Sequence, residues 1–365
     1  MEFFQVNISS QAIESATEVL QSGWISEVCK VKEFEAALSA RLGLCKPVAV
    51  NSGTSALNLA LAVAHVGPED EVILPAQTFV ATGTVVLSKQ AKPVFADIQC
   101  NTGNICPKSI SEKITERTKA IIPVHWGGYP CDLDEINDLA KRHNLIVIED
   151  AAHALGARYK GKPIGSISRF TAFSFQAIKH LTTGDGGVLC CLDEEDHSSA
   201  LNRRWFGIDR TNDQPSILGE REYDIKEVGY NYHMNNLAAA VGLGNLEDFP
   251  SNLVRRREIA KLYRGKLKDV PGLQLLDYED DRDSAYWLFT VLVERREDFI
   301  RALKSKSVPT SVVHLRIDKN SVFGGQTPDL PNQERFNEMQ VAIPLHSALT
   351  DEDVNLTIKT IKEGW

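Results

Sequence analysis

The sequence predicts an α/β protein whose large domain holds a mostly parallel sheet of the seven-stranded type, flanked by helices and followed by a smaller α+β domain. Short apolar runs alternate with helix-length segments in the first half of the chain, which is typical of βαβ units. This pattern changes after about residue 245, and 365 residues are more than one core usually holds. We therefore expect a large domain over residues 1–245 and a small domain over residues 246–365.

The elements of the large domain follow from hydrophobic periodicity and from the glycines and polar turns between the periodic segments. The expected helices cover residues 8–22, 31–43, 56–65, 78–90 and 133–143. The expected strands cover residues 47–50, 71–75, 93–97, 119–124, 145–150, 170–175 and 187–192.

The small domain mixes helices and strands without the regular alternation of the large one. Its first helix is basic and its last helix opens on a Thr-Asp-Glu-Asp start, a common N-terminal signal. The expected helices cover residues 253–268, 297–305 and 350–363, and the expected strands cover residues 285–294 and 308–315. Loops are expected over residues 211–221 and 318–333.

Composition and charge exclude several classes of protein. A net charge of −9 and a pI of about 5.6 argue against a partner that is a nucleic acid or an anionic membrane. No run approaches the roughly 20 apolar residues that span a bilayer, and residues 1–10 do not resemble a signal peptide. The seven cysteines form no CxxC pair and no zinc spacing with histidines, so we expect reduced thiols, a cytoplasmic location and no metal site.

Lys179 follows the apolar run 170–175 and precedes the glycine-rich segment 184–187. Such a lysine can form a Schiff base with an aldehyde cofactor, although a lysine taken at random is usually on the solvated surface. Asp150, at the end of another apolar run, supplies the carboxylate that a pyridinium nitrogen needs. The two residues carry the two charges that pyridoxal 5'-phosphate requires, and they are the candidate catalytic residues.

A candidate phosphate site lies in the small-residue turn 51–55, which connects a strand to a helix. Gly53 lets backbone amides approach an anion, and the hydroxyls of Thr54 and Ser55 can complete the site. Taken alone, this turn is more often an ordinary helix N-cap. Ser174, just before the candidate lysine, can reach the same phosphate, and the glycine run after that lysine is alternatively a hairpin turn.

Three further residues are candidates for contact with a flat cofactor ring. Phe79 follows a strand at the end where parallel sheets bind ligands, and it can stack on a ring or belong to the core. Ala152 is small enough for a ring to pack against the strand end after Asp150. His153 can reach a ring hydroxyl or can be an interior histidine bonded to the backbone.

Together these residues form an ordered set, and the chain resembles the DegT/DnrJ/StrS-type sugar aminotransferases within the fold type I pyridoxal-phosphate enzymes. This resemblance covers nearly the whole chain and implies an aspartate aminotransferase-like fold. The matching segments are residues 51–57, 74–82, 91–97, 149–154, the block around Lys179, and residues 204–210, 229–235 and 344–346.

The resemblance implies a role for each cofactor residue. Lys179 would carry the Schiff base of pyridoxal phosphate and Asp150 would bind the pyridine nitrogen. Phe79 would stack on the ring, while Gly53, Thr54 and Ser174 would bind phosphate. The family also forms homodimers in which the neighbouring subunit completes each site, which implies that Asn231 reaches the phosphate across the interface. His233 stands where many relatives have arginine.

The resemblance also places candidate substrate contacts, which are His125, His180, His314 and Arg316. Basic candidates for a nucleotide diphosphate are Arg204, Arg210 and Arg316, for each of which a solvated surface position is the alternative.

The reaction implied by the resemblance is a ping-pong transamination through pyridoxamine 5'-phosphate. L-glutamate would donate the amino group, and a nucleotide-linked keto-sugar would accept it, for surface polysaccharide or glycoside biosynthesis. The segment 182–187 favours carbon 4 of a 4-keto-6-deoxyhexose over carbon 3. One alternative is a sugar dehydratase, in which a histidine replaces the Schiff-base lysine; Lys179 followed by His180 favours transamination. The other is a non-catalytic regulator on this fold, which would need the loss of Lys179 or Asp150.

Overall fold

A seven-stranded mixed sheet forms the centre of the protein, as the computed structural model of residues 1–26, 29–209, 217–220 and 223–365 describes it. The strand order is β1-β9-β8-β5-β4-β2-β3, and β9 alone in this sheet runs against the others. The strands are β1 (Pro47–Val50), β2 (Glu71–Pro75), β3 (Lys92–Ala96), β4 (Thr118–Ile121), β5 (Ile146–Asp150), β8 (Phe170–Ser174) and β9 (Gly187–Cys191). This architecture confirms the predicted fold class.

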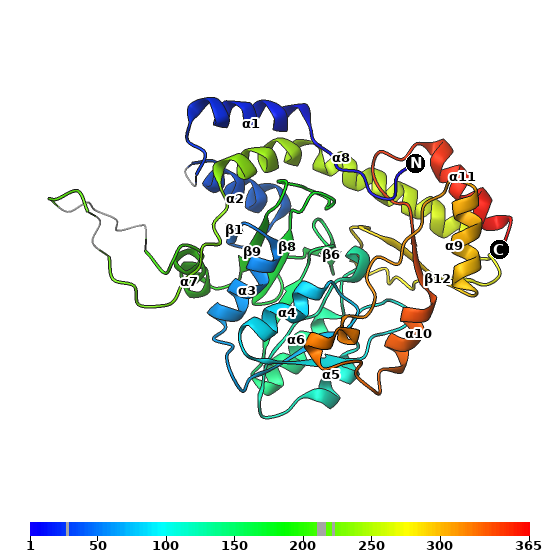
Figure 1. Ribbon diagram of the computed structural model, residues 1–365, viewed down its shortest axis with the longest axis horizontal. Coiled ribbons are helices and arrows are strands. Elements are labelled where there is room, and N and C mark those ends of the chain that lie inside the picture. Colours follow the sequence, from blue (N-terminus) through cyan, green and yellow to red (C-terminus); the bar gives the residue numbers. More distant parts are fainter. Residues whose placement is uncertain (27–28, 210–216, 221–222) are drawn as a thin grey trace.

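Helices cover both faces of the sheet (Figure 1). Strands such as β1, β2 and β9 are therefore buried on both sides and have no face open to solvent. Successive side chains of one strand enter opposite cores: Ile73 packs in one apolar cluster, and Leu74 in the other. The helices before residue 210 are α1 (Ser10–Ser22), α2 (Cys29–Leu42), α3 (Gly53–Val63), α4 (Val80–Ser88), α5 (Pro107–Lys113), α6 (Leu133–His143) and α7 (Glu194–Arg204). Hydrophobic periodicity does not predict α5 or α7.

Helix α8 (Asn236–Leu267) crosses the proposed boundary at residue 245, so the division into two domains stays a prediction. Beyond this helix, β10 (Leu273–Leu275), β12 (Phe289–Val293) and β13 (Gln340–Ile343) form an antiparallel sheet beside α9 (Arg296–Ser305) and α11 (Asp351–Lys362). None of the helices in the described part of the chain is long and apolar enough to span a membrane.

Two predictions for the C-terminal part are wrong. The expected strand over residues 308–315 is reduced to one β-bridge at Ser311. Pro309 has no N–H to donate, and the carbonyl of His314 accepts hydrogen bonds from side chains. The expected loop 318–333 instead contains short 3₁₀ turns and the start of helix α10 (Pro331–Met339). Of the expected loop 211–221, residues 211–216 and 221 lie outside the described residues.

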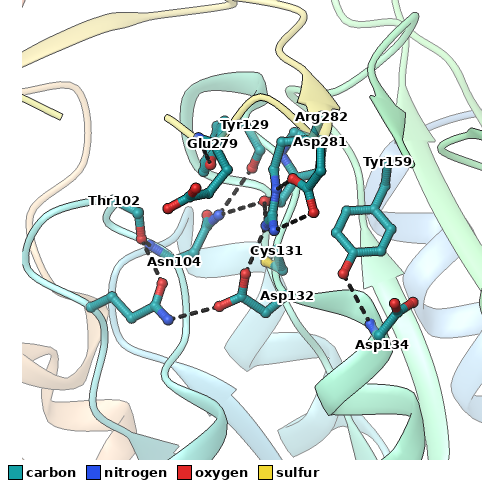
Figure 2. Close-up of polar contacts among 12 residues, drawn as sticks. Thr102, Asn104, Tyr129, Cys131, Asp132, Asp134, Tyr159, Glu279, Asp281 and Arg282 are labelled. Carbon is teal, nitrogen blue, oxygen red and sulfur yellow. Dashed lines mark hydrogen bonds and ion pairs between the residues drawn. The ribbon is translucent and has the colours of Figure 1, made fainter. Parts of the chain in front are cut away.

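An arginine whose side chain is mostly buried ties the C-terminal part to the first half of the chain, as Figure 2 shows. Arg282, in the short strand β11 (Arg282–Asp283), donates to Asp132 at 2.7 Å and to Asp281 at 2.6 Å. Its guanidinium also lies 4.7 Å from the ring centroid of Tyr159, in the short strand β6 (Arg158–Tyr159). β6 also pairs with β7 (Lys162–Pro163). These contacts fix the position of the chain segment that leads to Trp287.

Candidate active site

A cavity of about 450 Å³ opens where strands β2, β5 and β8 end. Ligands of parallel sheets bind at this edge, because the loops that follow the strands meet there. Nine of the predicted site residues line it: Gly53, Thr54, Phe79, Asp150, Ala152, His153, Ser174, Lys179 and His314. Residues that the sequence did not single out also line it, among them Phe4, Thr82, Asp185 and Trp287.

One end of the cavity is an anion cradle at the N-terminus of α3. The backbone there passes so close to β8 that a Cβ on Gly53 would lie 2.9 Å from the Cβ of Ser174, a distance that only glycine avoids. Ser52 caps the helix by accepting from the Ser55 amide at 3.0 Å. The Ser55 hydroxyl points away from the cavity and donates to Asn51 at 2.6 Å. Of the two predicted turn hydroxyls, the one of Thr54 therefore faces the cavity.

The other end of the cavity carries the carboxylate of Asp150, which is 6% exposed. The Thr82 hydroxyl donates to its Oδ2 at 2.7 Å, and the Ala152 amide donates to its Oδ1 at 3.2 Å. Burial raises the pKa of Asp150, and the hydrogen bond from Thr82 partly opposes this shift. No salt bridge to Asp150 exists among the described residues. The hydroxyl of Thr78, which precedes the N-cap of α4, lies 2.7 Å from that of Thr82, and the four-residue spacing of the two threonines is a signal that could have indicated this contact.

Lys179 lines the same cavity, on the loop that joins β8 to β9, and β8 lies between β1 and β5 in the strand order. Its Nζ is 3.6 Å from the ring centroid of Trp287, and within the described chain it has no hydrogen-bonding or ion-pair partner. Burial lowers the pKa of Lys179 to about 7, and the charge of Asp150 acts in the opposite direction. The side chain is thus a buried amine that can be neutral near physiological pH.

Two histidines line the wall beside the lysine. His153 stacks on Trp287 with ring centroids 3.8 Å apart, and its Nδ1 has no hydrogen-bond partner in the described structure. Burial lowers its pKa well below the usual value. Burial, together with the charge of Lys179, lowers the pKa of His314 to about 4. Its ring lies 5.3 Å from that of Phe79, which is 54% exposed at the mouth of the cavity.

The other two candidate histidines do not line the cavity. His125 is fully buried, with Nε2 at 2.8 Å from Glu149 and Nδ1 accepting from the Cys131 amide at 3.0 Å. His180 places Nε2 at 2.8 Å from the carbonyl oxygen of Ala285. These hydrogen bonds give both rings a role in holding the fold together.

The candidate arginines are also engaged elsewhere. Arg316 is buried in ion pairs with Asp318, at 2.6 Å, and with Glu334. Arg204 donates to Glu35 and to the Ala49 carbonyl. Neither lines the cavity. Arg210 lies outside the described residues.

Asn231 and His233 lie on the segment before α8, beside β1 and Asn51, and neither lines the cavity of its own chain. Asn231 is exposed, and its carbonyl accepts from the Asn51 side chain at 3.2 Å. The His233 ring meets Trp205 edge-on with centroids 4.1 Å apart.

The donor set fits pyridoxal phosphate. A glycine cradle with hydroxyls suits a phosphate, and a carboxylate that has no cation beside it among the described residues suits a pyridinium nitrogen. Lys179 follows the strand between them in the sheet, its amine has no hydrogen-bonding partner in the described part of the chain, and the cavity is of the size that small cofactors occupy. Among the described residues, no group of three or more His, Cys, Asp and Glu is arranged to hold a metal ion.

Known proteins share this architecture. Residues 6–362 match the profile of the DegT/DnrJ/EryC1/StrS aminotransferase family. Spore coat polysaccharide biosynthesis protein SpsC of Bacillus subtilis is 38% identical, over 98% of this chain and 95% of its own. Sugar aminotransferase CalS13 of Micromonospora echinospora superimposes with a TM-score of 0.95 at 35% identity, over 100% of both chains. Sugar aminotransferase Spr1654 of Streptococcus pneumoniae superimposes with a TM-score of 0.92 at 32% identity, over 100% of this chain and 98% of its own. Spr1654 has been solved in its pyridoxamine phosphate form and in its pyridoxal phosphate form.

Proposed function

This chain belongs to the DegT/DnrJ/EryC1/StrS aminotransferase family and is a pyridoxal-phosphate-dependent sugar aminotransferase, and we propose that it moves an amino group from L-glutamate to carbon 4 of a nucleotide-linked 4-keto-6-deoxyhexose. The observation that supports this assignment is that the Lys179 amine, unpaired among the described residues, shares one cavity with an anion cradle and the Asp150 carboxylate. The products would serve the synthesis of surface polysaccharides or glycosides, as the similarity to SpsC suggests.

We propose a task for each of the residues that would hold the cofactor. When bound, the cofactor supplies an aldehyde that takes up the amino group and a ring that withdraws electrons. Asp150 keeps the ring nitrogen protonated, and Ser174 and the α3 N-terminus bind phosphate. The Nζ of Lys179 would hold the aldehyde group, and once the incoming amino group has displaced it, the free amine would accept a proton and return it at a neighbouring carbon. Its lowered pKa suits this task, since a base must be neutral to accept a proton.

The test follows the two half-reactions separately. In the wild-type protein, L-glutamate should bleach the visible absorbance of bound pyridoxal phosphate, and a nucleotide-linked 4-keto-6-deoxyhexose should restore it and yield an amino sugar. Lys179→Ala should abolish both changes, whereas Lys108→Ala, at an exposed position, should leave them intact. Full activity of Lys179→Ala would refute the assignment. A deoxy sugar without nitrogen would favour the dehydratase, and an unchanged spectrum of the wild type would favour the regulator.

We further propose a homodimer in which Asn231 of one subunit completes the site of the other. Asn231 is exposed and does not line its own cavity, and large apolar side chains are exposed on and after α1, among them Ile13, Leu20 and Trp24. Such exposed apolar groups often mark an interface.

Subunit mixing tests this arrangement. Lys179→Ala and Asn231→Ala proteins should each be impaired, yet mixed dimers should regain activity, because one of their two sites combines an intact lysine with an intact asparagine. No recovery in mixed dimers that form normally would contradict a shared site.

A further inference from the structure

The first seven residues lie along the C-terminal part of the molecule, near α8 and α11 (Figure 1). His346 Nε2 is 3.1 Å from the Glu2 carbonyl oxygen, and Asn7 donates to the Ser347 hydroxyl at 3.2 Å. The Thr357 hydroxyl of α11 lies 3.8 Å from the sulfur of Met1. These contacts, spread along the segment, hold it in one place although it contains no helix or strand.

This course brings Phe4 to the cavity wall. The Phe4 ring stacks on Trp287 with centroids 5.4 Å apart and planes 23° apart, and Phe4 lines the cavity. Its neighbour Phe3 meets it edge-on at 4.6 Å, packs against the same apolar cluster and does not line the cavity. Of the two adjacent phenylalanines, Phe4 stacks on Trp287 and lines the cavity, whereas Phe3 does not line it.

Trp287 joins this aromatic surface to the lysine. Its Nε1 donates to the carbonyl of Ile178 at 3.1 Å, and its ring lies 3.6 Å from the Nζ of Lys179. Phe4, Ile178, Trp287 and Val313 thus form an apolar wall that extends from the reacting amine toward the outside. Trp287 is 2% exposed, its indole nitrogen is bonded to Ile178, and His153 stacks on its ring. The carbon surface of the wall therefore comes mainly from its partners, Phe4 among them.

We propose that Phe4 is a specificity residue for the sugar acceptor and that, with Trp287, it forms a wall that selects a deoxygenated edge of the hexose. This inference rests on the proposed function, because it concerns the acceptor of the same cavity. A methyl or methylene group gains by burial against the wall, whereas a hydroxyl group there gives up water without a new partner. An apolar pocket of this kind separates the two by at most about 100-fold.

The test compares Phe4→Ala with Phe4→Leu and with Phe3→Ala as the matched control. Single-turnover kinetics of the pyridoxamine form, with dTDP-, UDP- and GDP-linked 4-keto-6-deoxyhexoses, separate the Kd of the sugar from the rate of amino transfer. Calorimetric titration of the cofactor-free protein with the best of these acceptors gives a second Kd that does not depend on turnover.

For Phe4→Ala we expect both Kd values to rise about 10-fold, with a smaller loss in the glutamate half-reaction. Phe4→Ala should also reduce the preference for the 6-deoxy acceptor over its 6-hydroxy counterpart. Phe4→Leu should recover most of the affinity, because it restores the buried carbon surface, and Phe3→Ala should change neither Kd.

Three results would overturn the inference. They are an unchanged Kd for Phe4→Ala, an equal loss in both half-reactions, and an equal effect of Phe3→Ala. A wild-type protein without a glutamate half-reaction would instead reject the proposed function itself, so the two failures are distinguishable.

Discussion

Strand β5 ends in two adjacent carboxylates, and the regions that they enter are built differently. Glu149 points into the interior, where Oε2 lies 2.8 Å from His125 Nε2 and Oε1 accepts from the Ser168 amide at 3.0 Å. Asp150 points into the cavity, where its hydrogen bonds come from Thr82 and from a nearby backbone amide, and no cation of the described segments is paired with it. The alternation of side chains along a strand separates the two acids.

The contrast continues in the neighbours of each acid. Both ring nitrogens of His125, on the interior side, have a partner. On the cavity side, the Nδ1 of His153 and the Nζ of Lys179 have no hydrogen-bond partner within the described part of the chain. Buried polar groups are normally satisfied, so free hydrogen-bonding capacity indicates where a ligand is to be bound. The same residue types therefore serve stability on one side of the strand and binding on the other.

The sharpest way to break this comparison is to neutralise the acid on the cavity side. Asp150→Asn keeps the shape, since its amide oxygen can accept from Ala152 N–H while its NH₂ donates to the Thr82 hydroxyl, but it removes the charge that keeps the ring nitrogen protonated. We expect kcat/KM for transamination to fall by roughly 100-fold or more, with little loss of folding stability. Steady-state kinetics and urea unfolding measure the two quantities. A variant with near wild-type turnover would remove Asp150 from the catalytic set.

The matched substitution on the interior side is Glu149→Gln, for which we expect the opposite result. Because His125 Nδ1 accepts from the Cys131 amide, the ring proton is on Nε2. Nε2 therefore donates to Glu149, and the residue at position 149 must offer an acceptor there. An amide NH₂ in place of a carboxylate oxygen would face a donor, which costs about 2 kcal/mol of unfolding free energy. Urea unfolding measures this loss, with Glu135→Gln on the exposed face of α6 as control. Equal stability would mean that the interior pair can rearrange.

The sequence alone predicts those cavity residues that lie within a short motif. Gly53, Asp150 and Lys179 each belong to a short motif whose small or apolar neighbours reveal a turn or a strand end. Phe4 and Trp287 have no such context, since they meet only because the N-terminal segment packs against the C-terminal part.

Hydrogen bonds and ion pairs inside the protein explain why other candidate residues, such as His125 and Arg316, do not line the cavity. A lone histidine or arginine in a sequence shows its chemistry but not whether its hydrogen bonds are already used. His125 is bound to an acid far along the chain, which no local pattern could reveal. The partner of Arg316 is Asp318, two residues away, and this spacing is a signal that could have indicated an internal ion pair.

The buried amine on the cavity side should itself cost stability in the cofactor-free protein. The pKa of Lys179 is lowered from 10.5 to about 7, so between these pH values the unfolded chain binds more protons than the folded one. The unfolding free energy of the wild type should therefore rise with pH over this window. Lys179→Met should be more stable below pH 7, on the order of 1–2 kcal/mol, and this advantage should shrink toward pH 10. Denaturation at several pH values measures it, and Lys108→Met, which changes an exposed lysine, should show no such trend.

The smallest expected effect concerns the hydroxyl that supports Asp150. Thr82→Val preserves volume on α4 but removes the donor to Asp150 Oδ2, so the pKa of Asp150, already raised by burial, should rise further. The acid limb of the pH–rate profile should then move to higher pH, and kcat should fall by about 3- to 10-fold, which corresponds to one lost hydrogen bond. Thr84→Val, on the same helix, removes a hydroxyl that bonds only the Ala81 carbonyl and should leave the profile in place. If the two variants have the same pH–rate profile, the Thr82 hydroxyl does not set the pKa of Asp150. The difference between Asp150 and Glu149 would then come only from the absence of a paired cation at Asp150 among the described residues.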